Sequence, residues 1–290
     1  MLNDPSDFAS IDNDLAKLES WKYLSPDVAA IANSPRSLLL LSIPKSGTTW
    51  LRFLLINYAV QQRRLGADRI DYEKLKLFTA EREMILNGNN PVRSNIKPFL
   101  PKYGYDHLVY QHPRRARLYH DVQQHGGAKL LAYRNVLDYL VSNYYYFYEY
   151  RDGSRHLASH PRDLIAGYVR YWALCWRLFN EKIIPAGRAS LISYDALQLD
   201  TAAEFSRALT ELGVTIDDDA LERAIPMADA KVVSEDETRV KGFFGKLDRG
   251  NFVRNGSVDQ WTEHFTDADV DEVRRILEAC GVDPDDAIPN

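Results

Sequence analysis

One stretch, residues 38–58 with the sequence LLLLSIPKSGTTWLRFLLINY, limits the possible folds of this chain more than any other. Residues 38–43 are uncharged and almost entirely apolar, which predicts a strand buried on both faces. A short loop follows at residues 44–49, and from Trp50 onward apolar residues recur every three or four positions, as in a helix. A strand, a loop and a helix N-terminus in this order favour phosphate binding, because the first N–H groups of the helix lack partners and its dipole attracts anions.

The composition of the loop favours a phosphate site over an ordinary turn between a strand and a helix. Lys45 adds a positive charge, Ser46, Thr48 and Thr49 add hydroxyl donors, and Gly47 allows close approach of the backbone. A helix cap alone needs one hydroxyl and no cation. The loop is not a Walker loop, because that pattern places its Lys directly after the second Gly, whereas Lys45 precedes Gly47.

The order Pro-Lys-Ser-Gly-Thr-Thr-Trp at residues 44–50 resembles the 5′-phosphosulfate loop of the sulfotransferase family. Those enzymes move a sulfuryl group from 3′-phosphoadenylyl sulfate (PAPS) to a hydroxyl or an amine and release adenosine 3′,5′-bisphosphate (PAP), without a metal. The resemblance implies that residues 45–49 hold the 5′ side of the nucleotide and that Trp50 lies against the adenine. It also implies that Lys45 stabilises the charge on the leaving phosphate oxygen.

A short strand predicted at residues 108–110 leads to His112. The residues alone favour a loop histidine without a task at His112, since the chain has 7 histidines. The family places its general base at this position, and an imidazole with a pKa near 7 suits that task. The resemblance therefore implies that His112 deprotonates the acceptor. Tyr110 stands where cytosolic members usually have Lys, so a cation is missing here or is supplied from elsewhere.

A second buried strand predicted at residues 129–133 ends at Arg134, and a helix follows. The resemblance implies that Arg134 and Ser142, which are eight residues apart, bind the 3′-phosphate, for which the planar fork of an arginine is suited. Asp138 also matches the family pattern. A further parallel strand is predicted at residues 189–194, and by the same resemblance Tyr194 reaches the adenine end of the nucleotide.

Near the C-terminus, residues 254–265 resemble the family segment that closes over the nucleotide and binds its 3′-phosphate. Arg254, Gly256 and the later Trp and Phe match in register, and Asn255 replaces a Lys, which predicts weaker affinity for PAPS. A competing stretch at residues 241–245 has the glycines of this pattern but no Trp. We assign the segment that contains Arg254, Asn255 and Gly256.

The alternation of strands and helices predicts an α/β fold, with a single domain built on a central parallel sheet flanked by helices. The resemblance implies a P-loop-like nucleotide-binding fold of the sulfotransferase type at residues 36–290, after an N-terminal lead-in at residues 1–35. Helices are expected at residues 162–184, 201–213 and 217–225. Residues 61–107 have no periodic pattern and are expected to be irregular.

Composition limits which binding partners and which cellular compartment we expect for this protein. The net charge of -5 argues against a nucleic-acid partner, and 2 cysteines do not form a disulfide framework. The N-terminal residues lack the apolar core of a signal peptide, and no apolar run approaches the ~18 residues of a membrane span. We therefore expect a cytoplasmic protein. Aromatic residues on the helix after Arg134 favour a phenolic or lipid-like acceptor, whereas the polar loop at 87–97 favours a sugar.

Two other functions fit parts of the same sequence. One is a nucleotide-dependent kinase with an atypical phosphate loop, which would require Mg²⁺ held by carboxylates. The other is a non-catalytic nucleotide-binding module. Dependence on Mg²⁺ would identify the kinase, and a turnover assay with labelled PAPS would distinguish an enzyme from a binding module.

Overall fold

The apolar run at residues 38–43 forms β1 (Ser37–Ser42), the middle strand of a sheet in which every neighbouring pair is parallel. This computed structural model describes residues 34–64, 69–75, 78–81, 99–111, 127–150, 157–239 and 256–289. The strand order in the 5-stranded sheet is β2-β3-β1-β4-β5. The other strands are β2 (Thr79–Glu81), β3 (His107–Gln111), β4 (Ala128–Tyr133) and β5 (Ala189–Ser193). The predicted α/β class with a parallel sheet is confirmed.

Alternate residues of the central strands enter two separate hydrophobic cores. In β1, Leu38 and Leu40 pack into one core, while Leu39 and Leu41 pack into the other. All four side chains are at most 1% exposed, and each contributes about 1.5–3 kcal/mol by leaving water. A strand that is buried on both faces needs no polar alternation, which is why its sequence is a continuous apolar run.

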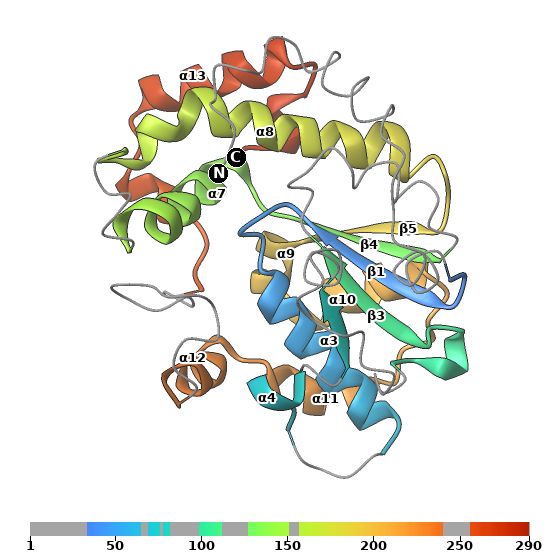
Figure 1. The fold of residues 1–290 in the computed structure, drawn as a ribbon. Coiled ribbons are helices and arrows are strands. Elements are labelled where there is room, and N and C mark those ends of the chain that lie inside the picture. The colour runs from blue at the N-terminus through green and yellow to red at the C-terminus, as the bar shows by residue number, and fades with distance from the viewer. Residues whose placement is uncertain are drawn as a thin grey trace.

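Helices cover both faces of the sheet (Figure 1). One face packs against α3 (Thr48–Gln62), α10 (Thr201–Glu211) and α11 (Asp218–Met227), and the other against α7 (Val136–Tyr144), α8 (Ile165–Arg177) and α13 (Asp267–Ala279). The remaining α-helices of the described residues are α4 (Tyr72–Leu75), α9 (Tyr194–Leu199) and α12 (Ala230–Arg239). The sheet is therefore the middle of three layers.

Helix α3 differs from the amphipathic helix that its spacing predicts. Nearly every side chain from Leu51 to Gln61 is buried, not only the face that packs on the sheet. The reason is that α11 and α4 pack against α3 as well. Arg52 and Asn57 are buried with the rest, so this helix contains polar groups that must find partners inside the protein.

Most other predicted elements are present with shifted bounds. The predicted helix at 162–184 is α8, preceded by a 3₁₀ turn (Pro161–Leu164) and followed by a π-helical turn (Leu178–Ile183). At the start of α11, the side chain of Asp217 accepts a hydrogen bond from the backbone N–H of Ala220, as expected of a helix cap. The expectation that residues 61–107 are irregular is wrong where they form α4 and β2.

The carboxyl ends of the strands lie together at one edge of the sheet. Leu41 is paired with Gln111 at the end of β3, Ser42 with Ala132, and Tyr133 with Ser193. Loops that follow parallel strands at such an edge are the usual place for a nucleotide. Among the described residues, no helix combines the length and hydrophobicity needed to cross a membrane.

Candidate active site

The loop between β1 and α3 turns sharply at two residues. Gly47, which caps α3, has φ 74, and Lys45 has φ 67, so both lie in the left-handed region. A residue other than glycine in that region costs roughly 1–2 kcal/mol, and such strain is concentrated at functional sites. The loop is closed internally by a hydrogen bond from Thr48 Oγ1 to Ser42 Oγ at 2.7 Å. Thr48, predicted to be a ligand donor, thus also holds the loop in shape.

The N-terminus of α3 has donors but no acceptor from the described protein. No side chain caps it, and its first turn contains no acidic residue. Ser46 is fully buried, and among the described residues its Oγ has no hydrogen-bond partner. Buried hydroxyls are nearly always bonded, so this one is suited to a ligand. The arrangement fits the anion that the sequence predicts for residues 45–49.

Tyr194 joins the loop to the C-terminal part of the chain. Its ring lies so close to Gly47 that a Cβ at that position would clash with the ring atoms. The ring also meets Trp50 edge to face, with 5.6 Å between centroids, and its hydroxyl donates to the carbonyl of Gly256 at 2.8 Å. Burial raises the pKa of Tyr194. Four predicted site residues, Gly47, Trp50, Tyr194 and Gly256, are thus brought together.

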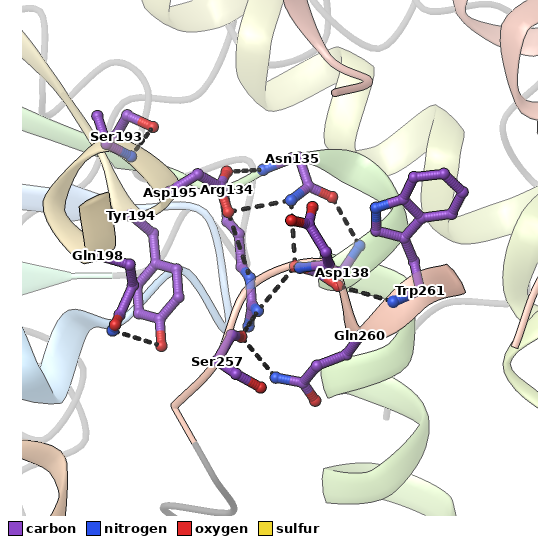
Figure 2. A network of polar contacts seen from close by, with 12 residues as sticks. Arg134, Asn135, Asp138, Ser193, Tyr194, Asp195, Gln198, Ser257, Gln260 and Trp261 are labelled. Atoms are coloured by element: carbon purple, nitrogen blue, oxygen red, sulfur yellow. Dashed lines mark hydrogen bonds and ion pairs between the residues drawn. The ribbon is translucent and has the colours of Figure 1, made fainter. Parts of the chain in front are cut away.

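Arg134 lies directly after β4, with its guanidinium between the Tyr194 ring and Asp138 (Figure 2). Its Cζ is 4.4 Å from the centroid of the Tyr194 ring. Nη2 donates to Asp138 at 3.0 Å and to the carbonyl of Ser257 at 2.7 Å, and Nε is 3.9 Å from Asp195. Arg134, which is predicted to bind the 3′-phosphate, therefore also bonds groups of its own protein. Among the described residues, its buried Nε makes no hydrogen bond.

Asp138 is the centre of this network, a role that its match to the family pattern did not predict. Its side chain is fully buried and accepts four hydrogen bonds. Two come from the side chains of Arg134 and Asn135, and two come from the backbone N–H groups of Asp259 and Trp261, both at 3.0 Å. The carboxylate thus attaches the C-terminal loop to the start of α7. A carboxylate with this many donors needs no further partner.

Asp195 completes the junction from the start of α9. It accepts from the backbone N–H of Asn135 at 2.7 Å and from its side chain at 3.0 Å. Burial raises the pKa of Asp195, while the hydrogen bonds from Asn135 and the charge of Arg134 act in the opposite direction. This carboxylate connects the end of β5 to the end of β4.

Two further cations, Lys45 in the loop and Arg52 on α3, each lie against an aromatic ring. Lys45 Nζ is 4.0 Å from the ring centroid of Tyr146, which belongs to the π-helical turn Tyr145–Glu149 at the end of α7. Arg52 Cζ is 3.7 Å from the ring centroid of Tyr110, the residue that stands where cytosolic sulfotransferases usually have Lys. Arg52 was not predicted as a site residue.

Several predicted site residues are not tested by these contacts. His112, Arg254, Asn255 and the competing stretch 241–245 lie outside the described residues. Ser142 is half-buried on α7, two turns beyond Arg134, and Thr49 is half-buried in the first turn of α3. Within the described part of the chain, no group of His, Cys, Asp or Glu is arranged to hold a metal ion.

Comparison with known proteins identifies the family. The family model of the sulfotransferase domain matches residues 35–280. A relative, Sulfotransferase 2A6 of Rattus norvegicus, is 24% identical over 262 residues, which is 83% of this chain and 83% of the relative.

Solved structures share the fold. A mouse sulfotransferase, SULT7A1, complexed with PAP has a TM-score of 0.53 at 17% identity, with 92% of this chain and 88% of that chain covered. Retinol dehydratase in a complex with retinol and PAP has a TM-score of 0.51 at 15% identity, with 92% of this chain and 93% of that chain covered.

Proposed function

The chain belongs to the sulfotransferase family, and we propose that it transfers a sulfuryl group from PAPS to the hydroxyl or amine of an acceptor. The observation that supports this most is the anion site at the start of α3. There, Ser46 Oγ and an uncapped helix N-terminus present donors without an acceptor from the described protein. The choice of PAPS as donor is further supported by the mouse sulfotransferase and retinol dehydratase, which are both complexed with PAP.

The proposed nucleotide site extends from this loop to the Arg134 junction. Residues 45–49 bind the 5′ side, and Trp50 and Tyr194, which meet edge to face, bind the adenine end. Arg134, Ser142, Arg254, Asn255 and Gly256 are assigned to the 3′-phosphate. The buried Nε of Arg134, which has no hydrogen-bond partner among the described residues, is suited to that phosphate.

In the proposed reaction, His112 takes the proton of the acceptor hydroxyl while the acceptor oxygen bonds to sulfur. The bond between sulfur and the phosphate oxygen breaks at the same time, and Lys45 offsets the charge that develops on that oxygen. The chain contributes mainly by positioning and electrostatics, as in phosphoryl transfer. His112→Ala should lower turnover about 10²- to 10⁴-fold with PAP affinity unchanged. His120→Ala is the matched control, and full activity of His112→Ala would assign the base to another group.

The proposed acceptor carries its hydroxyl on an aromatic or lipid-like body. This is supported by the contact of Lys45 with Tyr146, which places an aromatic segment beside the proposed transfer site. Turnover with a phenol, a long-chain alcohol and a monosaccharide should follow that order of preference. A preference for the monosaccharide would contradict the aromatic acceptor without affecting the assignment of the donor.

Calorimetry with two nucleotides tests the donor directly. PAP and adenosine 5′-monophosphate differ only in the 3′-phosphate, and each charge-assisted bond to it contributes about 1.5–3 kcal/mol. PAP should therefore bind at least ~100-fold more tightly than the monophosphate. Equal binding of the two ligands would contradict the assignment of PAPS.

A variant of Arg134 locates this preference in the structure. Arg134→Lys keeps a positive charge beside Asp138 but removes the planar fork, so most of the preference for PAP should be lost. Its melting temperature is measured alongside, because Arg134 also bonds Asp138 and the carbonyl of Ser257, and the affinities are compared where both proteins are folded. Retention of the full preference would place the 3′-phosphate elsewhere.

A further inference from the structure

Arg52 is a buried cation to which neither the fold nor the proposed reaction gives a task. The residue is 7% exposed, and its Nη2 donates to Thr79 Oγ1 at 2.8 Å. Its guanidinium lies over the ring of Tyr110, with Cζ 3.7 Å from the ring centroid. Within the described part of the chain, its buried Nε has no hydrogen-bond partner, and no carboxylate forms an ion pair with it.

A guanidinium in this environment is unusual, because a buried charge is costly unless it is paired. Arg134, by contrast, is a buried cation paired with carboxylates, with Asp138 at 3.0 Å and Asp195 at 3.9 Å. Arg52 has a hydroxyl and an aromatic ring instead. The described protein therefore keeps a desolvated positive charge without an internal anion, which is the pattern expected of a group that binds an anionic ligand.

The position of Arg52 relates it to the loop at residues 45–49. It follows Thr48 by one helical turn, a rise of about 5.4 Å, and side chains on a helix lean toward its N-terminus. Tyr110, on which the guanidinium rests, is the last residue but one of β3. In register it lies opposite Leu40, two residues before the end of β1. The guanidinium thus lies between the first turns of α3 and the carboxyl-terminal end of β3.

We propose that Arg52 is a second cation of the donor site, and that its Nε–H donates to an oxygen of the sulfuryl group during transfer. The inference rests on the proposed function. Lys45 would offset charge on the phosphate that leaves, and Arg52 would offset charge on the group that moves.

Comparing the affinities of PAPS and PAP, which differ in the sulfuryl group, tests the proposed contact of Arg52 with that group. Arg52→Gln can still donate to Thr79 but lacks the charge, so it should bind PAP as the wild type does and PAPS about 10- to 100-fold more weakly. Turnover with a fixed acceptor should fall by a similar factor. Arg52→Lys, which keeps the charge without the fork, should recover part of both losses.

The control is Thr79→Val, which removes the hydroxyl bonded to Arg52 and should lower the melting temperature without changing the ratio of PAPS to PAP affinity. Equal losses of PAP and PAPS affinity in Arg52→Gln, or unchanged turnover, would show that Arg52 only ties α3 to β2 and would overturn the proposal. If Arg52→Gln does not fold, an unchanged ratio in Arg52→Lys overturns it equally. A wild-type protein that binds neither nucleotide would instead refute the proposed function itself, and this inference with it.

Discussion

The two halves of the proposed nucleotide site differ in whether their buried polar and charged groups have partners within the described protein. At the loop between β1 and α3, Ser46 Oγ and Arg52 Nε have no acceptor among the described residues, and no acidic residue lies in the first turn of the helix. At the junction of β4 and α7, Arg134 is matched by Asp138, and Asp138 is matched by four donors.

This difference indicates that the loop serves ligand binding and that the junction serves the stability of the fold. An uncompensated positive site gains most when an anion arrives, so residues of the loop should control affinity and turnover more than stability. A neutralised buried network loses stability when one member is removed, because the remaining charge stays buried. Residues of the junction should therefore control the stability of the fold and the position of the C-terminal loop.

The largest effect is expected from Asp138→Ala. The change leaves Arg134 buried without its nearest carboxylate and frees the backbone N–H groups of Asp259 and Trp261. Breaking a buried pair in this way typically costs about 3–5 kcal/mol, which urea unfolding would measure. Asp219→Ala, at an exposed position in the first turn of α11, is the control and should cost less than ~1 kcal/mol. Similar losses in the two variants would show that the junction is not a stabilising network.

Next in size is Lys45→Ala, which tests the loop. It should lower both PAP affinity and turnover, each by about 10- to 100-fold, because the same ammonium acts on the bound nucleotide and in the transition state. Its unfolding free energy should fall by no more than ~1 kcal/mol, the value of the contact with Tyr146. If affinity falls and turnover at saturation does not, Lys45 only anchors the phosphate.

Ser46→Ala should lower PAP affinity by a smaller factor than Lys45→Ala and should leave stability intact. The hydroxyl is buried and has no partner in the described protein, so its removal should leave the melting temperature unchanged or slightly higher. PAP affinity, measured by calorimetry, should fall about 5-fold for the loss of one hydrogen bond. Thr48→Val should lower the melting temperature as well as PAP affinity, since its hydroxyl also bonds Ser42. A destabilised Ser46→Ala would contradict the division between the two regions.

The smallest effect is a pH dependence at the junction. Burial raises the pKa of Asp195 above its ordinary value of 3.8, so the folded protein binds its proton more tightly than the unfolded chain does. The resulting stability is fully present below pH 3.8 and is lost as the pH rises through the folded pKa. Relative to Asp195→Asn, the wild type should therefore gain stability as the medium is acidified through that window. A difference that is constant with pH would refute the shift.

Sequence patterns predicted the central strands because a strand buried on both faces must be apolar throughout. The same rule failed for β2 (Thr79–Glu81), because three residues at the edge of a sheet are too few to show a period. Resemblance predicted Gly47, Trp50, Tyr194 and Gly256 as binding residues, and the fold brings these four together.

What the sequence did not predict depends on contacts between distant segments. Asp138 matched the family pattern by position, but its two backbone donors are 121 and 123 residues further along the chain. Arg52 lies between Leu51 and Phe53 in a helix that looked amphipathic. Its side chain is buried against Thr79 of β2 and Tyr110 of β3, which lie 27 and 58 residues further along the chain. A charged residue inside an apolar run was the one available signal.

The long sequence separation between Asp138 and its backbone donors also has a consequence for folding during translation. A ribosome incorporates Asp138 more than a hundred residues before Trp261, whose backbone N–H completes its shell of donors. Until that segment leaves the exit tunnel, a nascent chain that has already packed β4 and α7 holds this carboxylate with only its local partners. Domains generally fold as units, and here residues 259–261 complete the network from far along the chain. A nascent chain that stops before Asp259 therefore lacks two of the four donors to Asp138, and Arg134 is not yet fixed in the arrangement that the complete fold gives it.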